Sequence, residues 1–146
     1  MSAKQNILMA LAVAGVTTTG VTANAEVVAH CGASQGTSYF FHDEIFNPEG
    51  PDWAEDGIGN GRIILVREAE DWDILFEDVF GSPGYRSDGA TVILLAMNAQ
   101  YITVGAFHPN YVDTYTFNLV ANEVVWTSHK TGTFAPKVAI YRADCS

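Results

Sequence analysis

The chain has 146 residues, with 17 acidic against 7 basic side chains and a formal net charge of −10 at pH 7. This length suits a single domain with one hydrophobic core. An excess of acids repels nucleic acid and anionic membranes, so we expect neither as a partner, and a basic extracytoplasmic protein or a small molecule remains.

The N-terminal 25 residues have the features of an export signal. Lys4 precedes an uninterrupted apolar run over residues 7–16, and the small-residue motif Ala23-Asn24-Ala25 follows. The apolar run is about ten residues, too short to cross a bilayer as a helix. We predict a signal peptide over residues 1–25, cleaved after Ala25, and one domain over residues 26–146. The protein is then exported to the periplasm or the medium, without membrane insertion after cleavage.

After the signal, turn residues separate short β-rich runs at spacings typical of an all-β domain. The clearest run, residues 114–119, alternates apolar and polar side chains, as in a strand with one buried face. We predict eight strands, over residues 37–42, 61–67, 72–79, 90–97, 100–107, 113–120, 123–130 and 136–143.

Eight strands joined in sequence favour an antiparallel up-and-down barrel, with a two-sheet β-sandwich as the alternative. In an even-stranded closed meander, the first and last strands are antiparallel neighbours. Cys31, before the first strand, then lies beside Cys145, after the last. An even cysteine count in an exported chain favours a disulfide. We therefore predict that a Cys31–Cys145 bridge closes the domain.

Residues 62–67 and 91–97 are apolar on both faces of their predicted strands, so something must cover the outer face. The segment 43–60 is the best candidate cover, because it carries Ile45, Phe46 and Trp53 among many acids.

The same segment is the candidate interaction loop, because long connections in compact domains are usually functional or disordered. Acidic charges would steer a basic partner and an aromatic side chain would anchor it. We take Asp52, Trp53, Glu55 and Asp56 as the candidate residues. The alternative is that the apolar side chains fold back as a lid and leave the acids solvated.

A second candidate site is the barrel interior. Eight-stranded barrels are at the size where the interior is either filled by side chains or holds one small ligand. The strand aromatics that would fill the core or line a cavity are Tyr101, Tyr115, Phe117, Trp126 and Tyr141.

Metal binding and catalysis have weaker support. His42, Asp43, Asp56 and Asn60 carry metal-ligand atoms, but the acidic loop does not follow the EF-hand spacing. The acid run over residues 68–78 would need two carboxylates in one cleft to act as a hydrolase. No nucleophile-elbow motif is present, and we expect no cofactor and no catalytic residue.

The motif Cys31-x-x-Ser34-x-Gly36-x-Ser38-Tyr39-Phe40 resembles the N-terminal part of a group of small exported bacterial β-rich proteins. The likeness continues through much of the chain, at residues 56–58, 61–63, 73–76, 114–117, 126 and 136–138 and at Cys145. It implies a disulfide-closed β domain outside the cytoplasm and brings no activity with it.

These observations predict a non-catalytic exported protein that binds a partner through its acidic loop. The alternative is a barrel that binds a small ligand, and a more distant one is an extracytoplasmic hydrolase.

Overall fold

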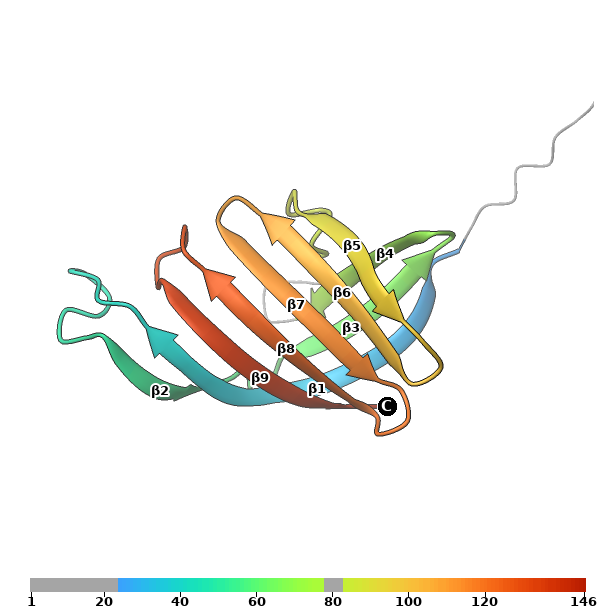
Figure 1. Ribbon diagram of the computed structural model, residues 1–146, viewed down its shortest axis with the longest axis horizontal. Helices are drawn as coiled ribbons and strands as arrows, with labels where there is room; N and C mark the ends of the chain where they lie inside the picture. The colour runs from blue at the N-terminus through green and yellow to red at the C-terminus, as the bar shows by residue number, and fades with distance from the viewer. Residues whose placement is uncertain (1–23, 78–82) are drawn as a thin grey trace, which may run out of the picture.

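The computed structural model of the protein describes residues 24–77 and 83–146 (Figure 1). Residues 1–23 of the predicted signal peptide and the end of the predicted strand 72–79 lie outside the described residues. The described chain contains no helix and nine strands: β1 (Glu26–Phe40), β2 (Asp52–Asp56), β3 (Arg62–Glu68), β4 (Asp71–Glu77), β5 (Thr91–Met97), β6 (Tyr101–His108), β7 (Tyr111–Asn118), β8 (Glu123–Lys130) and β9 (Lys137–Cys145).

Eight of these strands form a nearly closed antiparallel barrel, which confirms the predicted fold. The order is β4-β3-β1-β9-β8-β7-β6-β5, so the chain runs up and down and β9 returns to pair with β1. The seam lies between β4 and β5. On the β4 side, residues 83–85 pair with the strand edge, since Phe76 N–H donates to the Pro83 carbonyl and Tyr85 N–H to the Ile74 carbonyl.

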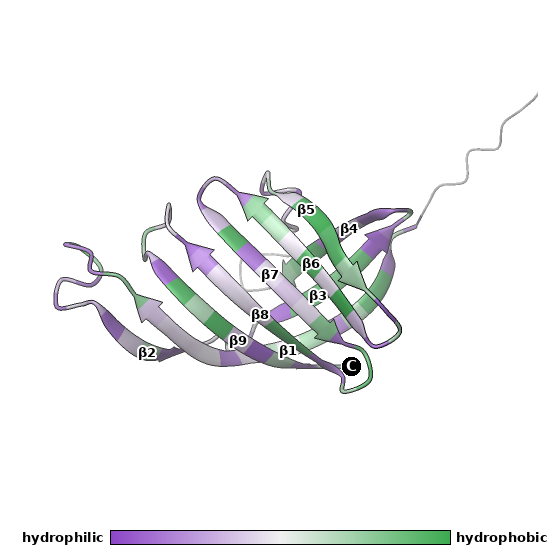
Figure 2. Cartoon of the chain, viewed as in Figure 1, coloured by the Kyte–Doolittle hydropathy of each residue, from purple (hydrophilic) through white to green (hydrophobic). Residues whose placement is uncertain are grey.

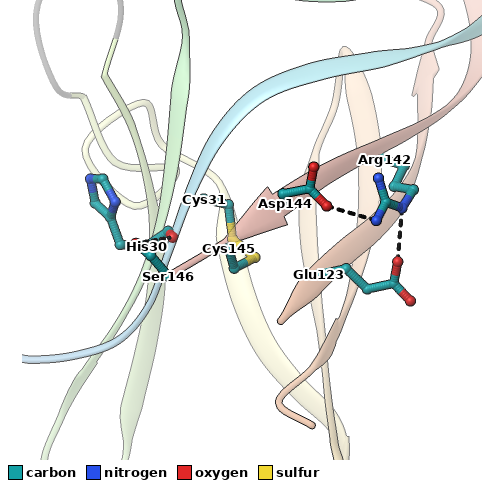
Figure 3. The surroundings of a disulfide bond; sticks show 7 residues. All are labelled: His30, Cys31, Glu123, Arg142, Asp144, Cys145 and Ser146. Carbon is teal, nitrogen blue, oxygen red and sulfur yellow. Dashed lines mark hydrogen bonds and ion pairs between the residues drawn. A yellow bond between two sulfur atoms is a disulfide. The ribbon is translucent and has the colours of Figure 1, made fainter. Parts of the chain in front are cut away.

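The first strand is longer than predicted, because β1 starts at Glu26 and not at Thr37. Cys31 therefore lies within β1 and is the register partner of Cys145 in β9. The two cysteines form the predicted disulfide, and next to it Ser146 N–H donates to the His30 carbonyl over 2.8 Å (Figure 3).

A β-bulge follows the disulfide in β1. The register with β9 shifts between Cys31 and Ser34, which places one extra residue on β1. Because side chains alternate along a strand, one extra residue exchanges the two faces. Cys31 and Ser38 are consequently both buried, although they are an odd number of positions apart.

The segment 43–60 does not cover the barrel as expected. It contains β2, which pairs with the C-terminal part of β1, beyond the stretch that pairs with β3 (Figure 1). Ile45, Phe46 and Trp53 are exposed. The backbone of the long β1 offers β2 a strand partner, so the segment extends the sheet and does not fold over it.

Within the described residues, the apolar outer face of β5 accordingly remains uncovered, with Ile93 and Leu95 exposed. Met97 is also exposed, although a β-bulge after Leu94 makes it the register partner of the inward-facing Ile102. In Figure 2, β5 is hydrophobic along its length.

Inward-facing side chains stack in three layers across β6, β7, β8 and β9. The strand registers place Ile102, Phe117, Val124 and Ala143 in the layer nearest the disulfide. The middle layer is Val104, Tyr115, Trp126 and Tyr141, and the third layer is Ala106, Asp113, Ser128 and Ala139. All twelve side chains are buried. The interior thus changes from apolar to polar along the barrel axis.

Candidate functional site

A cavity of about 370 Å³ lies beside the middle and third layers. Its wall includes the stretch where β2 ends and β3 begins, with Ile58, Gly61 and Ile63, and the part of β1 that contains the bulge. The aromatic lining is Tyr85, Tyr111, Tyr115, Trp126, Tyr141 and Phe76, and the polar lining includes Asp113, Ser128, Asp56 and Lys137.

Asp113 and Ser128 are the polar members of the third layer. They are register partners across β7 and β8, and they are only 4% and 2% exposed. The Asp113 Oδ2 atom accepts a hydrogen bond from the Tyr85 hydroxyl. Within the described residues, Asp113 Oδ1 and Ser128 Oγ have no hydrogen-bond partner. A buried polar atom without a partner costs about 1–3 kcal/mol, so this wall of the cavity is suited to a polar ligand group.

Small neighbours leave space beside these polar groups. Ala106 pairs with Asp113 on one side, and Ala139 pairs with Ser128 on the other. Methyl side chains at both flanking positions cannot fill the interior of a barrel of this width. The third layer therefore supplies polar atoms and the empty volume beside them, whereas the layer nearest the disulfide consists of packed apolar side chains.

Two tyrosine hydroxyls lie beside the Asp113 carboxylate and extend this polar cluster. The Tyr85 and Tyr115 hydroxyl oxygens are 2.8 Å apart. Burial, together with the nearby Asp113 carboxylate, raises the pKa of both Tyr85 and Tyr115 well above 10.0. Both hydroxyls consequently keep their protons at neutral pH and act as hydrogen-bond donors.

A second polar cluster lies on the β1 side of the cavity. Asp56 Oδ2 accepts hydrogen bonds from Lys137 Nζ, from Ser38 Oγ over 2.6 Å and from the Tyr141 hydroxyl over 2.6 Å. Burial disfavours the Asp56 charge, but these three bonds outweigh it and lower the pKa of Asp56 to about 2. Burial also disfavours the Lys137 charge, but its bonds to Asp56 and Tyr141 raise the pKa of Lys137. The pair is ionised at neutral pH.

The four residues of the predicted interaction loop lie on β2, where Asp52, Trp53 and Glu55 are exposed and Asp56 is half-buried. Trp53 is 67% exposed and packs edge-to-face on Tyr39, with ring centroids 5.2 Å apart. Glu55 is exposed, and Asp52 accepts a hydrogen bond from the Asn47 side chain. Asp56 belongs instead to the cluster with Lys137 at the cavity wall.

The predicted cavity residues divide into three groups. Tyr115, Trp126 and Tyr141 line the cavity, and the first two rings stack with centroids 5.3 Å apart. Phe117 is buried in the apolar layer nearest the disulfide. The prediction is wrong for Tyr101, which is 39% exposed, because the alternation of β6 turns Ile102 inward and Tyr101 outward.

Sequence reasoning missed Asp113, Ser128 and Tyr85. Asp113 is two positions before Tyr115 and Ser128 is two after Trp126, so strand alternation places both on the inward face. The sequence therefore contained enough information to place both side chains inside the barrel. Tyr85 follows Pro83-Gly84 in a turn region with no periodic pattern, so only the three-dimensional pairing with β4 reveals its inward position.

The weak metal candidates are not brought together. Asp43 Oδ1 accepts hydrogen bonds from the backbone N–H groups of Ile45 and Phe46, both at 2.9 Å, and so caps a turn. Asp56 forms an ion pair with Lys137, and His42 and Asn60 are exposed. Within residues 24–77 and 83–146, no three His, Cys, Asp or Glu side chains are grouped to hold a metal ion.

No helix in the described part of the chain is long and apolar enough to span a membrane. Comparison with protein-family models, with curated proteins and with solved structures finds no match to this chain.

Proposed function

We propose that the protein binds a small ligand inside its barrel. The observation that carries this proposal is the cavity of about 370 Å³, whose lining combines aromatic rings with two buried polar atoms that have no hydrogen-bond partner among the described residues. Ligand sites are typically concave and mostly apolar, with a few well-placed polar groups and volumes of about 300–1,000 Å³. The cavity has these properties, and binding fits it better than a role based on packing alone.

The geometry also supports a preformed site. The Tyr85, Tyr115 and Asp113 side chains are held by hydrogen bonds to one another, and the Tyr115 ring is held by stacking on Trp126. Groups fixed before binding lose little conformational entropy when the ligand arrives.

A thermal-shift screen of small organic molecules tests this function. We expect some compounds to raise the midpoint of wild-type unfolding, since a ligand that binds only the folded state stabilises it. The variant Ser128→Leu fills the third layer and should abolish these shifts, whereas Ser128→Ala should keep the cavity open. If no compound shifts the wild type, or if Ser128→Leu responds as the wild type does, the barrel is not a ligand site.

We also infer that the protein acts after export. The supporting observations are the signal-like residues 1–25 and the disulfide, a bond that persists in oxidising compartments. The intact mass of the protein recovered from the periplasm or the medium should correspond to a chain that starts at Glu26. A mass that retains residues 1–25 would contradict the export proposal.

A second candidate function is binding of a basic partner at β2. Within the described residues β2 pairs only with β1, so its other edge is free to take a strand. Exposed Trp53 and Glu55 lie on this strand, with Glu49 just before it. Reversing the charge at Glu49 and Glu55 while keeping Trp53 should slow association of a captured basic partner and reduce its salt dependence. Unchanged kinetics at low salt would remove this candidate.

A further inference from the structure

The third layer also indicates what kind of ligand the cavity takes, an inference that rests on the proposed binding function. Asp113 places a carboxylate deep in the barrel, at 4% exposure. The described part of the chain gives it no ion pair, because its cationic side chains pair with other acids or with none. Three cationic side chains line the cavity. Lys137 is bound to Asp56 and Arg62 pairs with Glu77, and within the described residues Lys130 forms no ion pair with Asp113 or with any other acid.

A buried carboxylate needs more than the single hydrogen bond that Tyr85 donates. Burying an unpaired charge is costly, and proteins normally pair such charges or neutralise them. In the part of the chain that the structure describes, Asp113 Oδ1 has no hydrogen-bond partner, and neither has Ser128 Oγ on the neighbouring strand. Both belong to residues that line the cavity. A ligand group that donates hydrogen bonds and carries positive charge would complement both atoms together.

The aromatic walls favour the same chemistry. Tyr85, Tyr115 and Trp126 line the cavity beside Asp113 and Ser128. The faces of such rings attract a cation within about 6 Å of the ring centroid, most strongly where water is excluded. A buried carboxylate in the lining of an aromatic-rich cavity is therefore a suitable receptor for an ammonium group. The overall charge of −10 also attracts cations and repels anions.

We propose that the cavity binds a small organic cation, namely a primary or secondary ammonium ion, whose N–H groups donate to Asp113 Oδ1 and Ser128 Oγ. The carbon skeleton of the ligand then lies against Tyr115 and Trp126. A neutral alcohol or amide could donate to the same atoms without compensating the charge, and a carboxylate ligand would be repelled.

Isothermal titration calorimetry on the disulfide-bonded protein provides the test, with matched probes. The probes are butylammonium and phenethylammonium, their neutral counterparts butanol and 2-phenylethanol, and the anion 3-phenylpropionate. We expect an ammonium ion to bind at least about tenfold more tightly than its alcohol, because hydrogen bonds to charged groups are the stronger ones. The anion should not bind detectably.

Variants separate the charge from the shape of the cavity. Asp113→Asn keeps an oxygen for the Tyr85 hydroxyl and should reduce ammonium affinity at least about tenfold, with little change for the alcohol. Ser128→Ala should weaken ammonium binding less than Asp113→Asn does. Asp144→Asn is the matched control, because it removes one carboxylate from an exposed position near the disulfide and should leave binding unchanged. Circular dichroism of each variant verifies the fold.

The outcomes distinguish this inference from the function on which it rests. If the alcohols bind as tightly as the ammonium ions, or if Asp113→Asn has no effect, the cation inference is overturned while ligand binding stands. If no probe binds and the thermal-shift screen also finds no ligand, the cation inference and the proposed ligand-binding function are both overturned. Tight binding of 3-phenylpropionate would likewise overturn the inference and point to an anion site.

Discussion

Gly36 in β1 and Tyr141 in β9 are register partners, and the missing side chain at Gly36 determines where the Tyr141 ring lies. A Cβ atom at Gly36 would contact the Ile140 carbonyl oxygen and lie 2.7 Å from Tyr141 Cδ1. Without it, the ring approaches β1 and its hydroxyl reaches Ser38 and Asp56. A single glycine thus allows a middle-layer aromatic of the barrel to join the polar cluster at the cavity wall.

The first prediction concerns this contact. Gly36→Ala should destabilise the protein by about 1–3 kcal/mol, the usual cost of forcing extra atoms into a packed site. Denaturant unfolding measures the loss. Gly59→Ala is the matched control, because a Cβ atom at Gly59 would have no neighbouring atom within 4 Å. The midpoint of its denaturant unfolding should stay near that of the wild type. Equal midpoints for the two variants would show that Tyr141 does not need the space.

The second prediction concerns Trp126 in the middle layer. Trp126→Ala should lower the free energy of unfolding by about 3–5 kcal/mol, because it removes a large buried side chain that stacks on Tyr115. Trp53→Ala is the control, since Trp53 is exposed and its loss should cost about 0.5 kcal/mol or less. Urea unfolding compares the two. A loss below about 1 kcal/mol for Trp126→Ala would mean that its ring is not part of the core.

The third prediction concerns the disulfide. Cys31 and Cys145 are separated by 114 positions in sequence, so their bond closes a loop that contains almost the whole domain. Replacing both with serine should lower stability by about 4–5 kcal/mol in the chain-entropy account. Urea unfolding of the double variant gives this value, and non-reducing mass spectrometry of the wild type should show two hydrogens fewer than the dithiol. Two thiols that react freely with an alkylating agent in the native protein would contradict the bridge.

The fourth prediction concerns pH. The folded-state pKa of Asp56 is about 2, below the ordinary value of 3.8, so its ionised form stabilises the fold. This contribution is fully present above the unfolded value and is lost as pH falls from about 4 through about 2.

Unfolding free energies measured between about pH 2 and neutral pH test whether the Asp56 contribution to stability is lost on acidification. The difference in stability between wild type and Asp56→Asn should be constant near neutral pH and shrink as the solution is acidified through this window. Asp52→Asn, a change at an exposed position of the same strand, is the control. A difference that grows on acidification would show that Asp56 has a raised pKa and no stabilising partner.

The sequence by itself determined the fold class and the bridge. The alternation over β7 and β8 placed Tyr115, Phe117 and Trp126 on inward faces, because side chains on a strand point alternately to opposite sides. The position of Cys31 near one end of the domain and Cys145 near the other, together with an even strand count, was enough to predict their pairing.

Tertiary structure decided the rest. β2 exists because β1 is long enough to pair with it beyond β3, which the local sequence of the acidic segment does not reveal. The bulge after Cys31 exchanges the two faces of β1, and this brings Ser38 to the Asp56 cluster.

The candidate site likewise depends on contacts between distant strands. Asp113 and Ser128 become partners through the β7–β8 register, and Tyr85 enters the barrel through pairing with the edge of β4. Periodicity reports which face of a strand a side chain occupies, but not which side chain of another strand lies opposite. The grouping of buried polar atoms around the cavity was therefore decided by strand register, a property of the folded chain.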